Sequence, residues 1–178
     1  MSIPDVEDLK DLGAKDQSEI RRWLRENQPD RGSGRGFWWE SIATRALQRV
    51  YDGGDDEDRR VYASVVKGAT DEAVELAVLS PVDGAIRIAN LAVVLGAHGR
   101  GLFDVDQVVK ECLSHIAIPF DVAAKQTSDW RALPQPSILA LRRAKNLISA
   151  CSPLRDRVTD AVLSAELTRW AALRDQLP

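Results

Sequence analysis

The chain has 178 residues, of which 44% are hydrophobic and 29% are charged, and its formal net charge is −3. A chain of this length and composition can bury a core without the help of disulfides or a metal. Its acidic balance argues against general attraction to nucleic-acid phosphates, which needs a basic surface. We therefore expect an ordinary folded protein, with residues 1–178 forming one domain.

The N-terminal segment, residues 1–8, has neither the basic nor the apolar region of a secretory signal. The most apolar stretch, residues 85–97, contains two polar residues and is shorter than the roughly 20 residues that cross a bilayer. These features predict a cytoplasmic protein with no membrane partner. Cys112 and Cys151 are then expected to be free thiols, because disulfides are rare in that compartment.

Apolar residues recur at the 3.6-residue spacing of helices throughout the chain, whereas the alternation typical of strands is nearly absent. From Trp39, apolar positions follow at +3, +4, +7, +8 and +11, which places them in one stripe on a helix. Side-chain oxygens before proline or acidic residues mark helix starts, and glycines and prolines mark the breaks. The pattern predicts helices at about 5–12, 17–27, 37–51, 57–67, 71–79, 81–97, 104–117, 120–127, 137–151 and 153–176.

Short connections between these helices favour antiparallel neighbours. We therefore predict an all-α fold, either a helical bundle or a short stack of antiparallel helical hairpins. The last predicted helix has two apolar faces, one with Leu154 and Val158 and one with Leu167 and Trp170. Such a helix is buried on two sides, is broken near Ser164, or presents one face to a partner. A homo-oligomer formed through this helix is one of the alternatives.

Glycines occupy alternate positions in the segment at about 29–36, which we expect to be a flexible loop rich in glycine and arginine. Its backbone N–H groups, with Arg31 and Arg35 beside them, could also bind an anion at the start of the next helix. The segment lacks the spacing of a nucleotide-binding loop and follows no predicted strand. A connector is therefore the favoured interpretation, and an anion site is the alternative.

Trp38 lies about 100° around its helix from the apolar stripe of Trp39, and Arg45 and Arg49 share its face. Because Trp39 already supplies an apolar anchor, we expect Trp38 to be exposed. An aromatic residue among arginines is typical of protein interfaces and of base-stacking surfaces. The sequence therefore predicts a partner-binding face of Trp38, Arg45 and Arg49, with the loop arginines at its edge. The alternative is an ordinary surface on which arginine stems cover the ring.

The chain has two histidines, which leave little material for acid–base or metal chemistry. His98 precedes a glycine and suits the end of a helix. His115 comes three residues after Cys112, but that cysteine lies on an apolar stripe, where thiols are inert. An enzyme would need His98 or His115 to meet a carboxylate such as Asp104 or Asp106. We predict no catalytic residue, metal or cofactor.

These observations favour a non-catalytic protein–protein interaction module, such as an adaptor, an inhibitor or an immunity-like protein of a bacterial system. The expected partner is another protein. A nucleic-acid-binding helical protein is the first alternative, and it would need the arginines of residues 21–49 and 142–157 to converge on one face. A small helical enzyme is the second alternative.

Overall fold

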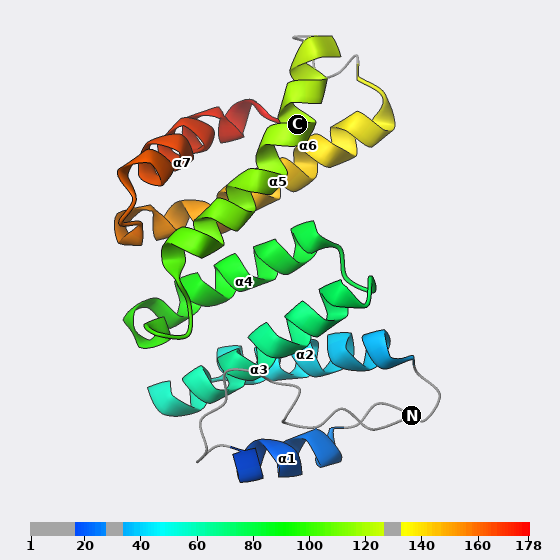
Figure 1. Ribbon diagram of the computed structural model, residues 1–178, viewed down its shortest axis with the longest axis vertical. Coiled ribbons are helices and arrows are strands. Elements are labelled where there is room, and N and C mark those ends of the chain that lie inside the picture. Colours follow the sequence, from blue (N-terminus) through cyan, green and yellow to red (C-terminus); the bar gives the residue numbers. More distant parts are fainter. Residues whose placement is uncertain (1–16, 28–33, 127–132) are drawn as a thin grey trace. The chain divides into compact units, whose positions relative to one another are not determined.

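The computed structural model describes residues 17–27, 34–126 and 133–178, and the regular elements in these ranges are all helices (Figure 1). The all-α prediction is confirmed. Within the described residues, no helix has both the length and the apolar character needed to cross a membrane. The α-helices are α1 (Gln17–Glu26), α2 (Arg35–Asp52), α3 (Asp56–Glu75), α4 (Pro81–Leu95), α5 (Val105–Gln126), α6 (Gln135–Cys151) and α7 (Ala161–Leu173).

The chain divides into two compact units. The first contains Met1–Gly84 and Leu95–Leu102, and the second contains Ala85–Val94 and Phe103–Pro178. That both units fold together as one domain stays a prediction. The predicted helix at 5–12 lies outside the described residues, as does most of the loop at about 29–36, of which the structure describes residues 34–36.

The α2–α3 hairpin forms the centre of the first unit, where the two helices pack against each other in antiparallel directions. Gly53 and Gly54 join them with φ angles of 101° and 142°, a backbone conformation that other residues rarely adopt. Asp55 then begins α3, because its side chain accepts a hydrogen bond of 2.9 Å from the N–H of Asp58. The buried apolar side chains of the pair are Trp38, Trp39, Ile42, Ala43, Ala46, Val50, Tyr62, Ala63, Val65, Val66, Ala69 and Ala73.

Helix α3 is one continuous helix where the sequence predicts two, at 57–67 and 71–79, so the predicted break is wrong. The break was expected at Thr70, a residue type that often caps a helix start. Thr70 is instead buried inside α3, and Val66, Ala69 and Ala73 around it are fully buried at helical spacing. Burial of this continuous stripe therefore outweighs the local capping signal.

The turn after α3 comes back to the start of α2. A Cβ atom on Gly36 would lie 2.2 Å from the Val78 Cγ2 and 3.3 Å from the Leu76 Cβ. Gly36 lies within α2, so glycine is required here for close packing between backbone and side chain. This contact explains one of the alternating glycines without an anion.

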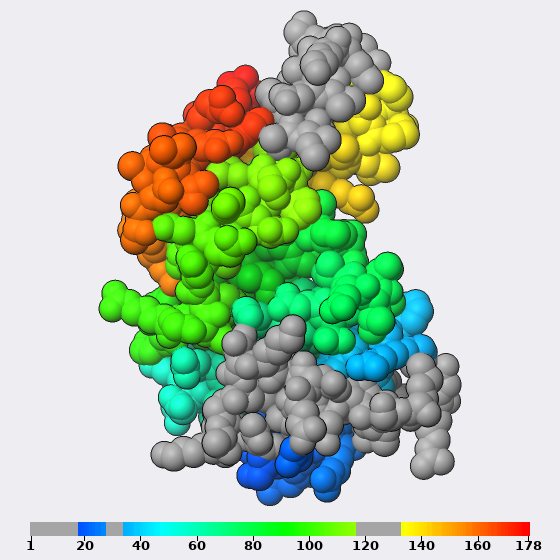
Figure 2. Space-filling model, viewed as in Figure 1, coloured from blue at the N-terminus to red at the C-terminus, as the bar shows by residue number. Residues whose placement is uncertain are grey.

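In the second unit, α5 packs against α6, and α7 packs against both. Buried apolar side chains of these helices include Val109, Cys112, Ile116, Leu141, Leu147, Leu167 and Trp170. In the space-filling view, α7, in orange and red, lies against the green atoms of α5 (Figure 2). Helix α5 is a single helix over the range where the sequence predicts two, at 104–117 and 120–127. A 3₁₀ helix, Ser152–Arg157, continues directly from α6.

The predicted helix at 153–176 is also wrong, because the chain leaves the helical path at residues 158–160 and α7 begins at Ala161. The cause is Asp106 on α5, whose carboxylate accepts hydrogen bonds from the N–H groups of Thr159 at 2.8 Å and of Asp160 at 3.2 Å, and from the Thr159 hydroxyl. Asp160 then caps α7 through the N–H groups of Val162 and Leu163. The break separates Leu154 and Val158 from α7, whereas Ala161 and Ala165, which share their predicted face, lie in α7 with Leu167 and Trp170. A homo-oligomer formed through this segment stays a prediction.

The close approach at Gly36 makes a stability prediction. Gly36→Ala should lower the free energy of unfolding by about 1–3 kcal/mol, because the added methyl group forces Val78 or the backbone to shift. Denaturant unfolding followed by circular dichroism measures this change. The control is Val78→Ala, alone and combined with Gly36→Ala, because this change removes the Cγ2 atom that the added methyl group would meet. The two losses of stability should not add, and strict additivity would contradict the packing requirement.

Candidate functional site

Trp38 is buried, with 8% of its surface exposed, so the expectation of an exposed tryptophan is wrong. The buried arc of α2 is wider than one stripe, because Trp38, Ile42 and Ala46 are buried along one edge and Trp39 and Ala43 along the next. The Trp38 and Trp39 rings pack edge to face, with centroids 4.9 Å apart and an angle of 87° between their planes. Trp38 is therefore a core residue of the first unit.

Arg45 and Arg49 lie on the predicted face of α2, and each has a partner within the first unit. The Arg45 guanidinium donates a hydrogen bond of 2.7 Å from Nη1 to the carbonyl oxygen of Asn27, the residue after α1. The Arg49 guanidinium lies over the Tyr62 ring, 5.1 Å from its centroid. A hydrogen bond to the Tyr62 side chain, together with the charge interaction between them, raises the pKa of Arg49. These two arginines therefore hold α1 and α3 in contact with α2.

The remaining arginines of the predicted site are placed only in part. Arg31 lies outside the described residues, and Arg35 is an exposed residue at the start of α2. The arginines of residues 142–157 belong to the second unit, where Arg157 donates a hydrogen bond of 2.7 Å to the Ala92 carbonyl oxygen. Binding of a macromolecule by Arg31, Arg35, Trp38, Arg45 and Arg49 stays a prediction.

Helix α1 is a docked amphipathic helix whose role the sequence reasoning missed. Its apolar side chains, Ile20, Trp23 and Leu24, are buried. The Trp23 ring contacts the Tyr62 ring edge to face, with centroids 5.4 Å apart. The signal for this docking was present in the sequence, since residues at i, i+3 and i+4 form one face of a helix.

Phe37, which directly precedes the two buried tryptophans of α2, has 66% of its surface exposed. Leu76, at the end of α3, is 41% exposed. Both border the Gly36 contact, because Phe37 follows Gly36 in α2 and the Leu76 Cβ lies against the Gly36 Cβ position. Phe37 and Leu76 therefore expose two large apolar side chains in one region of the first unit, which we call the Phe37 surface.

The two histidines pair with carboxylates other than Asp104 and Asp106, which the enzyme hypothesis names. The His98 Nε2 lies 3.2 Å from the Asp56 Oδ2, and the His115 Nε2 lies 3.2 Å from the Glu111 Oε1 on the same helix. All four side chains are at least partly open to solvent. Surface contacts of this kind contribute little to stability and do not by themselves mark a catalytic pair.

The candidate carboxylates have structural partners. The Asp104 Oδ1 accepts a hydrogen bond of 3.2 Å from the N–H of Gln107 and so caps α5. Hydrogen bonds from Thr159, first from its hydroxyl and then from its N–H, lower the pKa of Asp106. Both carboxylates therefore serve to start or anchor a helix.

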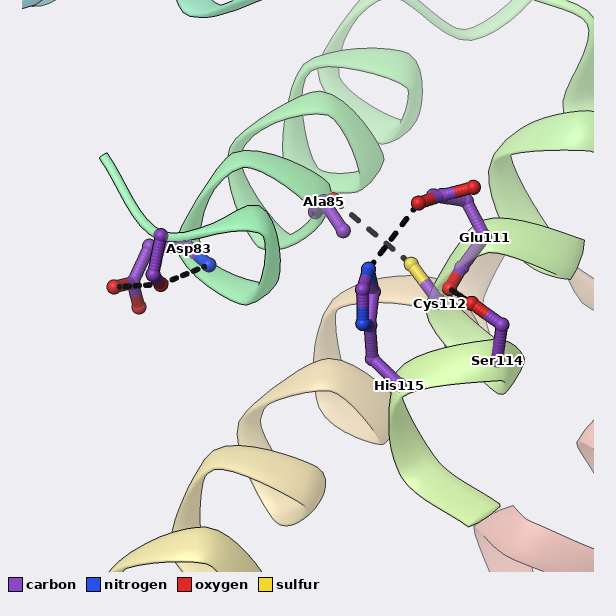
Figure 3. A network of polar contacts seen from close by, with 7 residues as sticks. Asp83, Ala85, Glu111, Cys112, Ser114 and His115 are labelled. Atoms are coloured by element: carbon purple, nitrogen blue, oxygen red, sulfur yellow. Dashed lines mark hydrogen bonds and ion pairs between the residues drawn. The ribbon is translucent and has the colours of Figure 1, made fainter. Parts of the chain in front are cut away.

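The two thiols are free and buried, as predicted. The Cys112 Sγ donates to the Ala85 carbonyl oxygen at 3.8 Å, while the neighbouring His115 ring pairs with Glu111 (Figure 3). A hydrogen bond with the Cys151 thiol and burial of the sulfur both raise the pKa of Cys112. The reactive thiolate form is therefore disfavoured.

Within the described part of the chain, no group of three or more His, Cys, Asp or Glu side chains could hold a metal ion. Comparison with protein-family models, with curated proteins and with solved structures finds no match.

Burial of the thiols predicts slow chemical modification. In the folded protein, Cys112 and Cys151 should react with a thiol reagent at least about a hundredfold more slowly than in denaturant, because reaction requires opening of the core. Release of the coloured product of Ellman's reagent measures the rate. Labelling of either thiol at the rate of an unfolded chain would contradict the burial and reopen the hypothesis of a Cys112 nucleophile.

Proposed function

We propose that this chain is a non-catalytic helical module that binds another protein. One observation carries the proposal, the exposure of Phe37, with Leu76 also exposed at the Gly36 contact next to it in the chain. Trp38 and Trp39, the next two residues of α2, are buried, whereas most of the Phe37 side chain is left uncovered. Exposed aromatic residues with aliphatic neighbours are typical anchors of protein interfaces.

The surroundings of Phe37 suit binding rather than catalysis. Helix α2 and the turn after α3 are in close contact here, because a Cβ atom on Gly36 would lie 2.2 Å from the Val78 Cγ2. The two histidines, by contrast, make surface contacts with carboxylates, and the two thiols are buried. A cytoplasmic adaptor, inhibitor or immunity-like protein of a bacterial system fits this description.

The proposal is tested with Phe37→Ser. A protein that the chain captures from its native lysate is purified, and its affinity for the wild type and for the variant is measured by calorimetry. Loss of the aromatic anchor should weaken binding by about 2 kcal/mol or more, roughly 30-fold, and leave thermal unfolding nearly unchanged.

Tyr51→Ser is the matched control, because Tyr51 is also an exposed aromatic residue of α2, at 52%, but lies near its opposite end. This variant should bind the partner like the wild type. Unchanged affinity of Phe37→Ser, or equal losses in both variants, would contradict a protein-binding role for the Phe37 surface. Capture of nucleic acid without any protein would favour the nucleic-acid alternative.

A further inference from the structure

Helix α1 resembles a short peptide helix that is bound to the rest of the first unit. It is ten residues long, which is shorter than the roughly 12–15 residues that a helix needs to persist alone in water. Its apolar anchors, Ile20, Trp23 and Leu24, stand at i, i+3 and i+4, the spacing by which amphipathic helices dock into the grooves of other proteins. Its helical structure therefore depends on the surface to which it is docked.

Two contacts with α2 and α3 hold the docked helix, one at its aromatic anchor and one at its end. The Tyr62 ring, held under the Arg49 guanidinium, contacts the aromatic anchor Trp23. Arg45 donates its hydrogen bond to the Asn27 carbonyl, at the end of α1. A cation at this position complements the negative end of a helix and satisfies a carbonyl that has no partner within the helix. We call Arg45, Arg49 and Tyr62 the α1-binding face.

We propose that the α1-binding face is a site for an amphipathic helix of another protein, and that α1 occupies it as an intramolecular competitor. The inference rests on the proposed function of protein binding, but it uses a face other than the Phe37 surface. We expect a partner helix that fits this face to have large apolar residues at i, i+3 and i+4, with an aromatic residue at i+3, and to end close to Arg45. This chemistry follows from the way in which the face holds α1.

Competition follows from the covalent connection. A short tether gives α1 an effective concentration in the millimolar range at its own site, so a free helix of equal intrinsic affinity is largely excluded. When α1 docks less well, a larger fraction of molecules has an open site, and the apparent affinity for an added helix rises in proportion. A partner must therefore bind more tightly than α1, or bind when α1 has been released.

The test uses the full chain and a fluorescent peptide with the sequence of residues 17–27, with binding followed by anisotropy. The receptors are the wild type and Trp23→Ala, in which the tethered helix has lost its aromatic anchor. The variant should bind the peptide at least about tenfold more tightly than the wild type. A peptide carrying the same Trp23→Ala change should bind the variant at least about tenfold more weakly than the unchanged peptide.

The matched control is Arg22→Ala, which changes an exposed residue of α1 beside the anchor and should bind the peptide like the wild type. If Trp23→Ala does not fold, Leu24→Ala removes a smaller anchor of the same helix and serves as the receptor. A folded anchor variant that binds no peptide, or that binds both peptides equally, would overturn the inference. Adding Phe37→Ser to the receptor should leave its affinity for the peptide unchanged. The α1-binding face and the Phe37 surface are therefore tested separately, and a negative result for one does not decide the other.

Discussion

The contacts of Tyr62 connect three helices of the first unit, α1, α2 and α3. This buried side chain of α3 meets the edge of Trp23 from α1 and lies beneath the Arg49 guanidinium from α2. Aromatic and cation–π contacts each contribute about 0.5–2 kcal/mol beyond area burial, and more when they are desolvated. A helix as short as α1 needs such contacts to stay helical. The position of α1, and with it the availability of the face beneath, therefore depends on Tyr62.

This arrangement changes the interpretation of the arginines. Arg45 and Arg49 share a helix face, as expected, but the structure uses them within the chain, one at a carbonyl oxygen and one over an aromatic ring. A surface that holds a helix of its own chain already has the chemistry to hold a similar helix from elsewhere. The Phe37 surface is a different kind of region, because its apolar side chains are exposed in the described structure. The first unit thus offers one open surface and one that is occupied from within.

Local patterns in the sequence were enough to predict the all-α class, the stripe of Trp39, Ile42 and Ala43, and the burial of both thiols. They could not show that Trp38 is buried, because a helical wheel gives relative angles but not the width of the arc that neighbours cover. Asp106 shows a second limit. Its partner Thr159 lies 53 residues away in the chain, so no local signal marks the break before α7. No local pattern marks Phe37 as an exposed aromatic residue, because the two tryptophans after it give the stronger apolar signal.

Native-state hydrogen exchange tests most directly whether α1 is a separate, docked element. The amides of residues 21–27 are compared with those of residues 42–50 in α2, in the wild-type chain without any partner. We expect the α1 amides to exchange at least about tenfold faster, because α1 can open while α2 and α3 stay folded. Exchange of both sets with the same opening free energy would contradict this description, since α1 would then be an integral part of the core and could not act as a competitor.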